Sequence, residues 1–332
     1  MLIGDMELAL SPTSPGMSVR QSAALCRWGE ELGYRQAWLA EVAGPDAFVL
    51  AAAAAAQTEH MELGVAVVPA FTRTPAALAT AAASVSQVLA GRTFTLGIGA
   101  SSETIVSGWH GVAFDHPRRR VEEMVEAVRA ALGGGSDYHG DLVSMRRFKM
   151  ASPPEGAVPV YVGALRPGML ELAGAIGDGV CLNLMPPEVV PRQLAAVRQG
   201  AEARGRSLPT DFGVVARLQV VATDDAEVVR QELRQTMLGP YLAQPVYNRF
   251  LAWMGYPEEA AAIAAGWAAR DREAVSRALH DRLVDALAVI GGPARVRERL
   301  EEYAASGLTV AALSVAAASP AVVEDTLRAL VP

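Results

Sequence analysis

Eight short apolar runs alternate with segments of helical periodicity along the whole chain, and this alternation restricts the possible folds more than any other feature. Each run is rich in β-branched or other apolar residues and is bounded by Gly, Pro or Asp. Such runs are typical of parallel strands that are buried on both faces of a sheet. The predicted strands are Leu2–Leu8, Gln36–Leu39, Glu62–Val68, Thr93–Ile98, Val158–Val162, Gly179–Leu184, Gly213–Val221 and Val310–Val315.

The segments between the runs have the periodicity of a helix. Apolar residues in Val121–Leu132 recur three or four positions apart and so line one side of a helix. Gly33 follows the first helical stripe, where a left-handed residue ends a helix, and Gly291-Gly292-Pro293 marks the start of a late one. Strands joined by helices predict a parallel sheet with helical crossovers.

The number of units decides between the two common forms of such a sheet. Eight units favour a closed (β/α)8 barrel, a TIM barrel, over an open doubly wound sheet. An open dinucleotide-binding sheet would carry G-x-G-x-x-G after its first strand, and Leu10–Gly16 lacks that motif. We therefore predict an α/β fold with one TIM-barrel domain over residues 1–332.

Two spacings between strands are too long for a single helix and predict insertions after strands 4 and 7. The first, Gly99–Ala157, contains a Tyr138–Met150 stretch that could form a short extra strand. The second, Thr223–Leu308, holds a helical insertion over approximately 224–290. In a barrel enzyme such insertions lie mostly on the C-terminal face and shape the pocket, although they can also serve only packing or dimer formation.

Composition and charge exclude several classes of function. Lys and Arg number 29 against 36 Asp and Glu, a net charge of −7 without a basic run, so we expect neither a nucleic-acid partner nor an anionic membrane surface. Met1–Leu10 lacks an export signal, and the Val49–Ala56 run is too short to span a bilayer. Cys26 and Cys181 form no metal-binding motif. We expect a cytoplasmic protein with reduced cysteines and no metal site.

The C-terminal ends of barrel strands carry the catalytic groups of such enzymes, and here they are poor in acid–base residues. Only Glu41 is ionisable and lies directly at a strand end, with Arg166 close behind another. Hydrolysis and metal catalysis therefore rank low, whereas ends rich in Gly, Ala and Ser suit a cofactor that carries its own reactivity. The strand ends are Ala9–Ser11, Ala40–Glu41, Ala66–Pro69, Gly97–Ser102, Gly163–Gly168, Asn183, Thr223 and Ser314.

Two of these ends are candidate sites for a flavin or a phosphate group. Gly97–Ser102 combines two hydroxyl groups with little side-chain bulk. Gly163–Gly168 leads into a helix that begins near Met169, whose free amides and positive dipole end favour an anion. Arg166 could add a charged contact or point into solvent. Any strand-to-helix turn can be rich in glycine, so each signal is weak when taken alone.

Several stretches, taken together and in order, resemble the luciferase-like monooxygenase superfamily, the (β/α)8 group that includes bacterial luciferase and the coenzyme F420-dependent oxidoreductases. Thr72–Pro75 and the Ser101–Gly111 stretch, which ends in Gly-Trp-His-Gly, are more similar to the F420 branch than to the FMN branch. The stretches that carry the resemblance are Leu63–Pro69, Thr72–Pro75, Ala90–Arg92, Leu96–Gly99, Pro159–Leu165, Glu171–Gly174, Gly177–Val180 and Gly291–Pro293.

The resemblance implies where a deazaflavin would bind. The third strand of these enzymes carries a bulge with a cis peptide bond, which would be Ala66–Val67 here. Family members also dimerise through helices near strands 2 to 4, so we expect a homodimer. Ala51–Ala56 and Ala76–Ala83 could pack between the subunits, or instead within one chain against the barrel. The cofactor contacts carried over are Ala66, Val67, Val68, Gly99, Ala100, Ser101, Gly163, Ala164, Leu165, Arg166 and Gly168.

The chain departs from the family at the end of the second strand. The sugar-phosphate and alcohol dehydrogenases of the family have Asp-His there, whereas this chain has Ala40-Glu41, so sugar-phosphate activity is in doubt. Glu41 becomes the candidate catalytic residue, as a proton donor or a substrate-orienting group, unless it caps the helix that starts near Asp46. His110 is the second candidate, with a surface role as its alternative.

These observations predict a coenzyme F420-dependent oxidoreductase that transfers a hydride between C5 of the deazaflavin and a small organic substrate. Two alternatives stay open. The first is an FMN-dependent luciferase-like monooxygenase, and the second is a barrel that binds a flavin without catalysis. The sequence does not identify the substrate.

Overall fold

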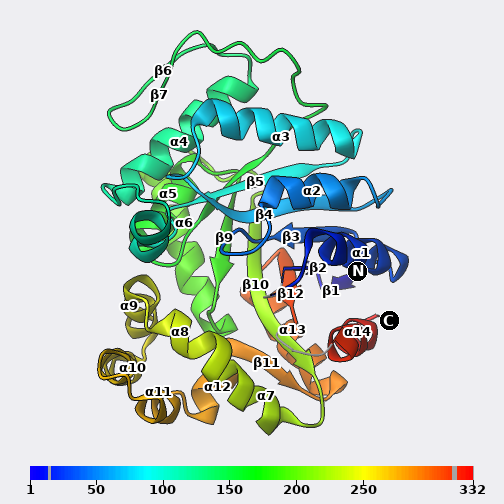
Figure 1. Cartoon of the computed structure of the whole chain (residues 1–332), viewed down its shortest axis with the longest axis vertical. Helices are drawn as coiled ribbons and strands as arrows, with labels where there is room; N and C mark the ends of the chain where they lie inside the picture. The colour runs from blue at the N-terminus through cyan, green and yellow to red at the C-terminus, as the bar shows by residue number, and fades with distance from the viewer. Residues whose placement is uncertain (14–15, 316–319, 332) are drawn as a thin grey trace.

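The computed structural model describes residues 1–13, 16–315 and 320–331, and in it eight parallel strands pair side by side into a ring (Figure 1). The order around the ring is β2-β12-β10-β9-β8-β5-β4-β3, and a β2–β3 pairing of Leu10 with Ala37 closes it. The predicted TIM barrel is therefore confirmed. The strands are β2 (Met6–Leu10), β3 (Gln36–Leu39), β4 (Glu62–Pro69), β5 (Phe94–Gly99), β8 (Val160–Gly163), β9 (Gly179–Asn183), β10 (Gly213–Ala222) and β12 (Val310–Ser314).

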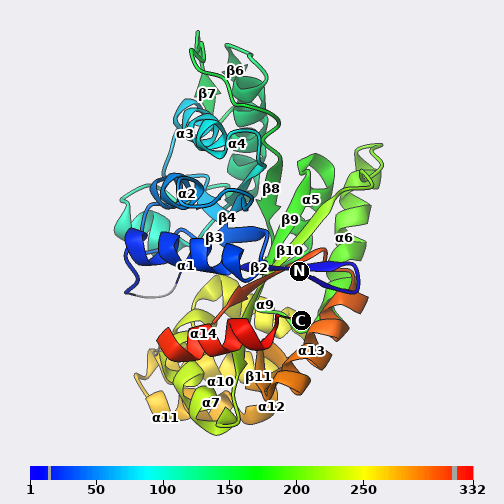
Figure 2. The ribbon, with the colours of Figure 1, turned by 90° about the vertical axis from the view of Figure 1, so that its right-hand side faces the viewer.

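A helix follows each barrel strand and covers the outside of the ring (Figure 2). Local signals fix where several helices start and stop. Ser18 forms a capping box with Gln21, and Gly33, at φ 100°, follows the end of the first helix as predicted. The surrounding helices are α1 (Val19–Glu31), α2 (Ala47–Ala55), α3 (Pro75–Leu89), α4 (Pro117–Leu132), α5 (Pro167–Ile176), α6 (Val190–Ala203) with the preceding turn η2 (Pro187–Val189), α13 (Pro293–Ser306) and α14 (Pro320–Ala329).

Both predicted insertions are present, and Figures 1 and 2 place the hairpin of the first and the helices of the second at opposite ends of the molecule. After β5 come a π-helical turn, η1 (Thr104–Trp109), and, beyond α4, a hairpin of β6 (Tyr138–His139) and β7 (Ser144–Met145). After β10 the chain forms α7 (Ala226–Leu233), η3 (Arg234–Leu238), α8 (Gly239–Leu242), α9 (Pro245–Met254), α10 (Pro257–Ala268), α11 (Arg272–Ala278) and α12 (Asp281–Leu287).

Most predicted strand boundaries are within one residue of those in the structure, and three larger differences remain. The first predicted strand is instead a hairpin of β1 (Leu2–Ile3) with β2, because Gly4 adopts φ 57° and turns the chain between them. An additional strand, β11 (Ala288–Gly291), pairs with the last residues of β10 outside the ring. The strand predicted to begin at Val158 begins at Val160, after Pro159, which has no amide to donate to a ladder.

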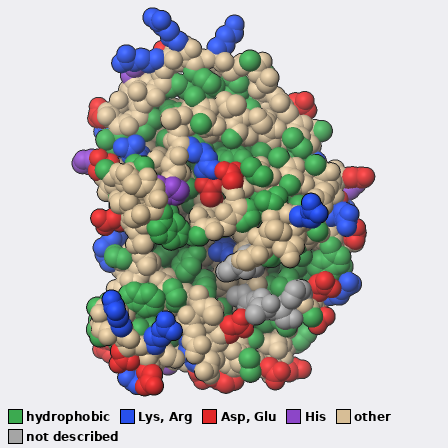
Figure 3. All heavy atoms as spheres, in the orientation of Figure 1, with side chains coloured by type: hydrophobic (Ala, Val, Ile, Leu, Met, Phe, Trp, Pro, Cys, Tyr) green, Lys and Arg blue, Asp and Glu red, His purple; other side chains and the backbone are tan. Residues whose placement is uncertain are grey.

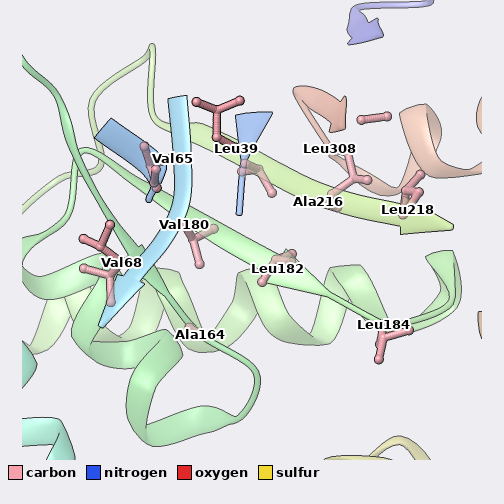
Figure 4. Close-up of a cluster of buried hydrophobic side chains, with 14 of the residues drawn as sticks. Leu39, Val65, Val68, Ala164, Val180, Leu182, Leu184, Ala216, Leu218 and Leu308 are labelled. Carbon is pink, nitrogen blue, oxygen red and sulfur yellow. The ribbon is translucent and has the colours of Figure 1, made fainter. Parts of the chain in front are cut away.

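The main core lies between the ring and its helices. Figure 4 shows Leu39, Val65, Val180, Leu182 and other strand side chains packed in this layer. The small residues of α2 and α3 are buried here: the alanines at 47, 51, 54, 55, 79, 82 and 83 contact the rest of the chain. Alternation along each strand leaves the remaining side chains to point into the barrel. Within the described ranges, no helix is both long and apolar enough to cross a membrane.

Candidate functional site

The N-terminal half of the barrel interior is filled by two aromatic side chains. Trp38 and Tyr161 lie with their ring centroids 5.6 Å apart. The strands around them carry glycine, because a Cβ atom at Gly64 would lie 2.5 Å from the Trp38 ring and one at Gly179 would lie 2.5 Å from the Tyr161 ring. No ligand fits at this level, so a site inside the barrel must lie in its C-terminal half, where barrel enzymes have theirs.

A bulge in β4 forms one wall of that half. The pairing of β4 with β5 shifts register between Val65 and Val68. The Val67 side chain projects inward over two neighbouring strands, since a Cβ atom at Gly99 would lie 2.6 Å from Val67 Cγ2 and one at Gly163 would lie 3.0 Å from Val67 Cγ1. Val67 remains partly exposed. The wall is therefore apolar, built from small residues and open to solvent at its upper edge.

The opposite wall is polar. Asn183 of β9 and Arg217 of β10 are paired in register and face the interior, one level above Cys181 and Val215. Arg217 Nη2 donates to Ser314 Oγ at 2.9 Å and to the Thr13 carbonyl at 3.3 Å. We use the name polar wall for Asn183, Arg217, Gln219 and Ser314 on the strands, together with Tyr247 of α9.

Tyr247 belongs to the second insertion and reaches back to the barrel. Its hydroxyl oxygen accepts a hydrogen bond from Asn183 Nδ2 at 3.1 Å. Burial and the nearby Tyr241 raise the pKa of Tyr247 to about 12, although the Asn183 hydrogen bond and the charge of Arg217 act in the opposite direction. The phenol therefore stays protonated near neutral pH and keeps its own proton available to donate.

The two insertions meet on the C-terminal side of the barrel. Thr104 of η1 donates a hydrogen bond to the side chain of Gln244, which precedes α9, at 2.8 Å. Figure 3 shows this face hollowed near its middle, over β9 and β10, with hydrophobic side chains along part of the hollow. Asn183 and Arg217 of the polar wall, and Ala66 and Val67 of the apolar β4 bulge, each keep some exposed surface.

Arginine side chains gather where α5 begins. Arg166 is the N-cap residue of α5, and no side chain caps that end of the helix. Partial burial, and then the nearby guanidinium of Arg249 in α9, hold the pKa of Arg166 below its ordinary value. Within the described residues neither arginine forms an ion pair. Two positive charges beside the amide end of a helix favour an anion between them.

Glu41 lies at the end of β3, as predicted, but it is already engaged. Its carboxylate forms an ion pair with Arg73, with Oε2 2.9 Å from Nη2, and accepts a hydrogen bond from the Ala47 amide at 3.0 Å. Arg73 also pairs with Asp46, the N-cap residue of α2. The structure thus favours the capping alternative for Glu41. Both of its oxygens have partners, which leaves it little freedom to deliver a proton.

His110, the second candidate, follows η1 and is exposed beside Trp109, whose side chain is 54% exposed. Its imidazole makes no hydrogen bond or ion pair with the described residues. No hydrogen bond therefore joins the two predicted catalytic residues in the described part of the chain. A proton role for either one stays a prediction.

A family model described as luciferase-like monooxygenase matches residues 6–310. The chain belongs to this family. The 5,10-methylenetetrahydromethanopterin reductase of Archaeoglobus fulgidus is 26% identical to it over 313 residues, which cover 92% of this chain and 91% of that protein. The F420-dependent glucose-6-phosphate dehydrogenase of Mycolicibacterium fortuitum is 30% identical over 237 residues, which cover 69% and 68% of the two chains.

A solved structure shows the same fold. The coenzyme F420-dependent tetrahydromethanopterin reductase of Methanopyrus kandleri superposes on this luciferase-like chain with a TM-score of 0.82 and 20% identity, over 98% of this chain and 97% of that one. The bulge that the resemblance predicted in β4 is present as well, with a cis peptide bond between Ala66 and Val67.

The contacts that the resemblance implied fall into two groups in this luciferase-like chain. Val68, Gly99 and Ala164 are buried, and Figure 4 shows Val68 and Ala164 among the core side chains, so only their backbone atoms could face a ligand. Gly99 and Gly163 also make room for Val67. Their contact with a cofactor stays a prediction. The residues with exposed surface are Ala66, Val67, Ala100, Ser101, Gly163, Leu165, Arg166 and Gly168.

The polar wall was not predicted from the sequence, apart from Asn183 and Ser314 as strand ends. One signal was available. Arg217 and Gln219 interrupt Gly213–Ala222, an otherwise apolar strand, at alternate positions. Polar residues on one face of a strand that is buried on both faces must point into a polar space or toward a ligand.

Proposed function

We propose that this chain is a coenzyme F420-dependent oxidoreductase that acts on a small organic substrate. The names of its relatives support the choice of cofactor, since both the A. fulgidus and the M. fortuitum proteins reduce or oxidise a small organic compound and the second is named as F420-dependent. The observation that carries the proposal is the β4 bulge with its wall of small residues, next to the start of α5, which no side chain caps and where Arg166 lies.

The residues of the site fit the parts of this cofactor. The β4 bulge offers the apolar surface of Ala66 and Val67 to a flat ring, with Ala100 and Gly163 on the neighbouring strands. Arg166 and Arg249 offer two guanidinium groups to a phosphate, and Gly168, which has open space where a Cβ atom would lie, leaves the helix amides accessible.

The remaining groups of the site suit a cofactor of this kind. When bound, coenzyme F420 supplies or accepts a hydride at C5 of its deazaflavin ring. The chain then has to orient the ring, exclude water and donate or accept one proton. The aromatic side chains in the N-terminal half of the barrel, together with the insertions, limit the access of water to the ring. The polar wall provides hydrogen-bond donors opposite the bulge.

Parallel titrations with coenzyme F420 and FMN test this proposal. Tryptophan fluorescence of the full chain is followed while each cofactor is added under the same conditions. We expect saturable binding of F420 at micromolar concentrations and much weaker binding of FMN. Binding of FMN without binding of F420 would overturn the proposal and favour an FMN-dependent monooxygenase, which oxygen uptake during turnover would then detect.

A further inference from the structure

The polar wall contains more hydrogen-bonding capacity than the protein itself uses. Among the described residues, Arg217 Nε, Gln219 Nε2 and Asn183 Oδ1 are buried without a hydrogen-bond partner. Gln219 is 3% exposed, and alternation along β10 places it on the same face as Arg217. A buried polar atom without a partner destabilises the folded chain, so groups that remain in this condition indicate a ligand or ordered water.

Donors outnumber acceptors in this wall, and its charge is positive. Arg217 and Gln219 each have a free N–H group. The Tyr247 oxygen accepts a hydrogen bond from Asn183, so the Tyr247 hydroxyl proton is still available to donate to a ligand. Arg217 is bonded only to a hydroxyl and to a carbonyl oxygen, and no carboxylate of the described chain pairs with it. A partly buried guanidinium without a counter-ion favours an anionic ligand with oxygen acceptors.

The wall is also built to hold its donors in place. Ser314 on β12 and the Thr13 carbonyl fix one end of the Arg217 guanidinium. Tyr247 is held by Asn183 and by the ring of Tyr241, whose centroid lies 5.3 Å away in an edge-on arrangement. Donors that are fixed in this way lose little rotational freedom when a ligand binds.

We propose that the polar wall binds a carboxylate group of the substrate, with Arg217 pairing with the carboxylate and Tyr247 donating a hydrogen bond to it. This inference rests on the proposed function, and it restricts the substrate class to small organic acids. Arg217 is then a specificity-determining residue, because a neutral analogue of the acid would leave its charge without a partner. The hydrocarbon part of such a molecule would then face the cofactor ring that the apolar bulge holds across the opening.

The experiment compares benzoate with benzamide, two probes that share a ring and differ in charge. Isothermal titration calorimetry measures the binding of each probe to the full-length wild-type chain and to Arg217→Met, with Arg198→Met, an exposed arginine of α6, as the matched control. We expect benzoate to bind more tightly than benzamide. Arg217→Met should weaken benzoate binding by about tenfold or more, and Arg198→Met should leave it unchanged.

Further variants separate a local effect from loss of folding. Arg217→Lys keeps the charge but removes the planar guanidinium that can donate two hydrogen bonds to one carboxylate. This variant should therefore retain part of the affinity for benzoate. Tyr247→Phe should weaken benzoate binding by about three- to tenfold. Circular dichroism checks the fold of each variant. Equal affinity for the two probes, absence of benzoate binding, or an unchanged benzoate affinity in folded Arg217→Met would each overturn the inference.

Titration of the same variants with coenzyme F420 distinguishes the two proposals. If Arg217→Met still binds F420 but has lost benzoate binding, the result supports both the proposed function and the carboxylate site. If the wild-type chain does not bind F420 but binds benzoate through Arg217, the carboxylate site stands and the proposed function fails. If the wild-type chain binds F420 but shows no preference for benzoate over benzamide, the proposed function stands and the carboxylate site fails.

Discussion

Arg73 joins the end of β3 to the start of α2 by holding the carboxylates of Glu41 and Asp46 together. Its guanidinium lies over the Phe48 ring, 5.2 Å from the centroid. Burial lowers the pKa of Arg73, but its hydrogen bond to Glu41 and the charges of both acids outweigh this and raise it. Glu41, the first catalytic candidate from the sequence, is therefore part of a network of ion pairs that links β3 to α2.

Glu41→Gln tests this interpretation. Loss of the ion pair and of a charged acceptor for the Ala47 amide should lower the free energy of unfolding by about 1–3 kcal/mol. Urea denaturation measures the change, with Glu31→Gln as control. Among the described residues, that glutamate takes part only in an exposed helical pair with Arg27. A variant with unchanged stability and abolished turnover would instead support the proton role predicted from the sequence.

Gly99→Ala should destabilise the barrel, because the new Cβ atom would lie 2.6 Å from Val67 Cγ2. Overpacking of this kind costs about 1–3 kcal/mol. The additional replacement Val67→Ala should recover much of the loss. Gly168→Ala is the control, since nothing lies within 4 Å of its Cβ position. Thermal denaturation compares the four chains, and equal melting temperatures for wild type and Gly99→Ala would contradict the proposed packing.

The barrel was predictable from the sequence because strands buried on both faces cannot carry polar side chains outward, and their apolar runs are easily recognised. β11 was not, since Ala288–Gly291 is four residues long and follows α12 without a break. The same strand explains why Arg217 was missed. β10 continues to Ala222 in order to pair with β11, so the residue at the barrel opening lies well before the end of the strand.

Contacts between distant segments were the part that the sequence could not supply. Tyr247 lies 64 residues from Asn183, in an insertion whose helices have no recognisable motif. Glu41 could be placed at a strand end, but its partner Arg73 lies 32 residues away after another strand. Strand ends can be inferred from periodicity, whereas the partner of each side chain depends on how the connecting segments pack.

Glu123 gives the chain an acid-sensitive contact outside the site. It is 2% exposed and accepts hydrogen bonds from the amides of Asp141, Leu142 and Val143 at 3.1, 2.7 and 2.9 Å, which fixes the turn between β6 and β7. Burial raises its pKa, but the hydrogen bonds from Arg119 and from these amides outweigh it and hold the pKa below the ordinary value.

A carboxyl with a lowered pKa in the folded chain stabilises it above the unfolded pKa, about 4.3 for Glu, and loses this effect as the pH falls through the folded value. We therefore expect Glu123→Gln to reduce stability at pH 7 by about 2–3 kcal/mol. The difference from wild type should shrink progressively below about pH 4.3. Denaturation across this range measures it, with the exposed Glu301→Gln as control. A difference that does not depend on pH would refute the assignment.

We propose that the chain forms a homodimer through the exposed sides of α2 and α3. Many of their alanines pack inside the chain, but Val49 and Val88 are 58% and 41% exposed. Val49→Glu should shift the population toward monomer in light scattering, because an uncompensated charge at an apolar contact is costly. Val228→Glu on α7, where the valine is 67% exposed, serves as control. A monomeric wild-type chain at all concentrations would rule the proposal out.

The last prediction concerns the arginine pair beside α5. If Arg166 and Arg249 bind the phosphate of the cofactor, Arg166→Met should weaken the binding of coenzyme F420 by about tenfold. Affinity should also depend less on salt in this variant, since one charge–charge contact has been removed. Arg198→Met again provides the control. Fluorescence titrations at two salt concentrations measure both effects, and inorganic phosphate should compete with F420 for the wild-type chain. An unchanged affinity in Arg166→Met and Arg249→Met would place the phosphate elsewhere and leave the two guanidinium groups without a ligand.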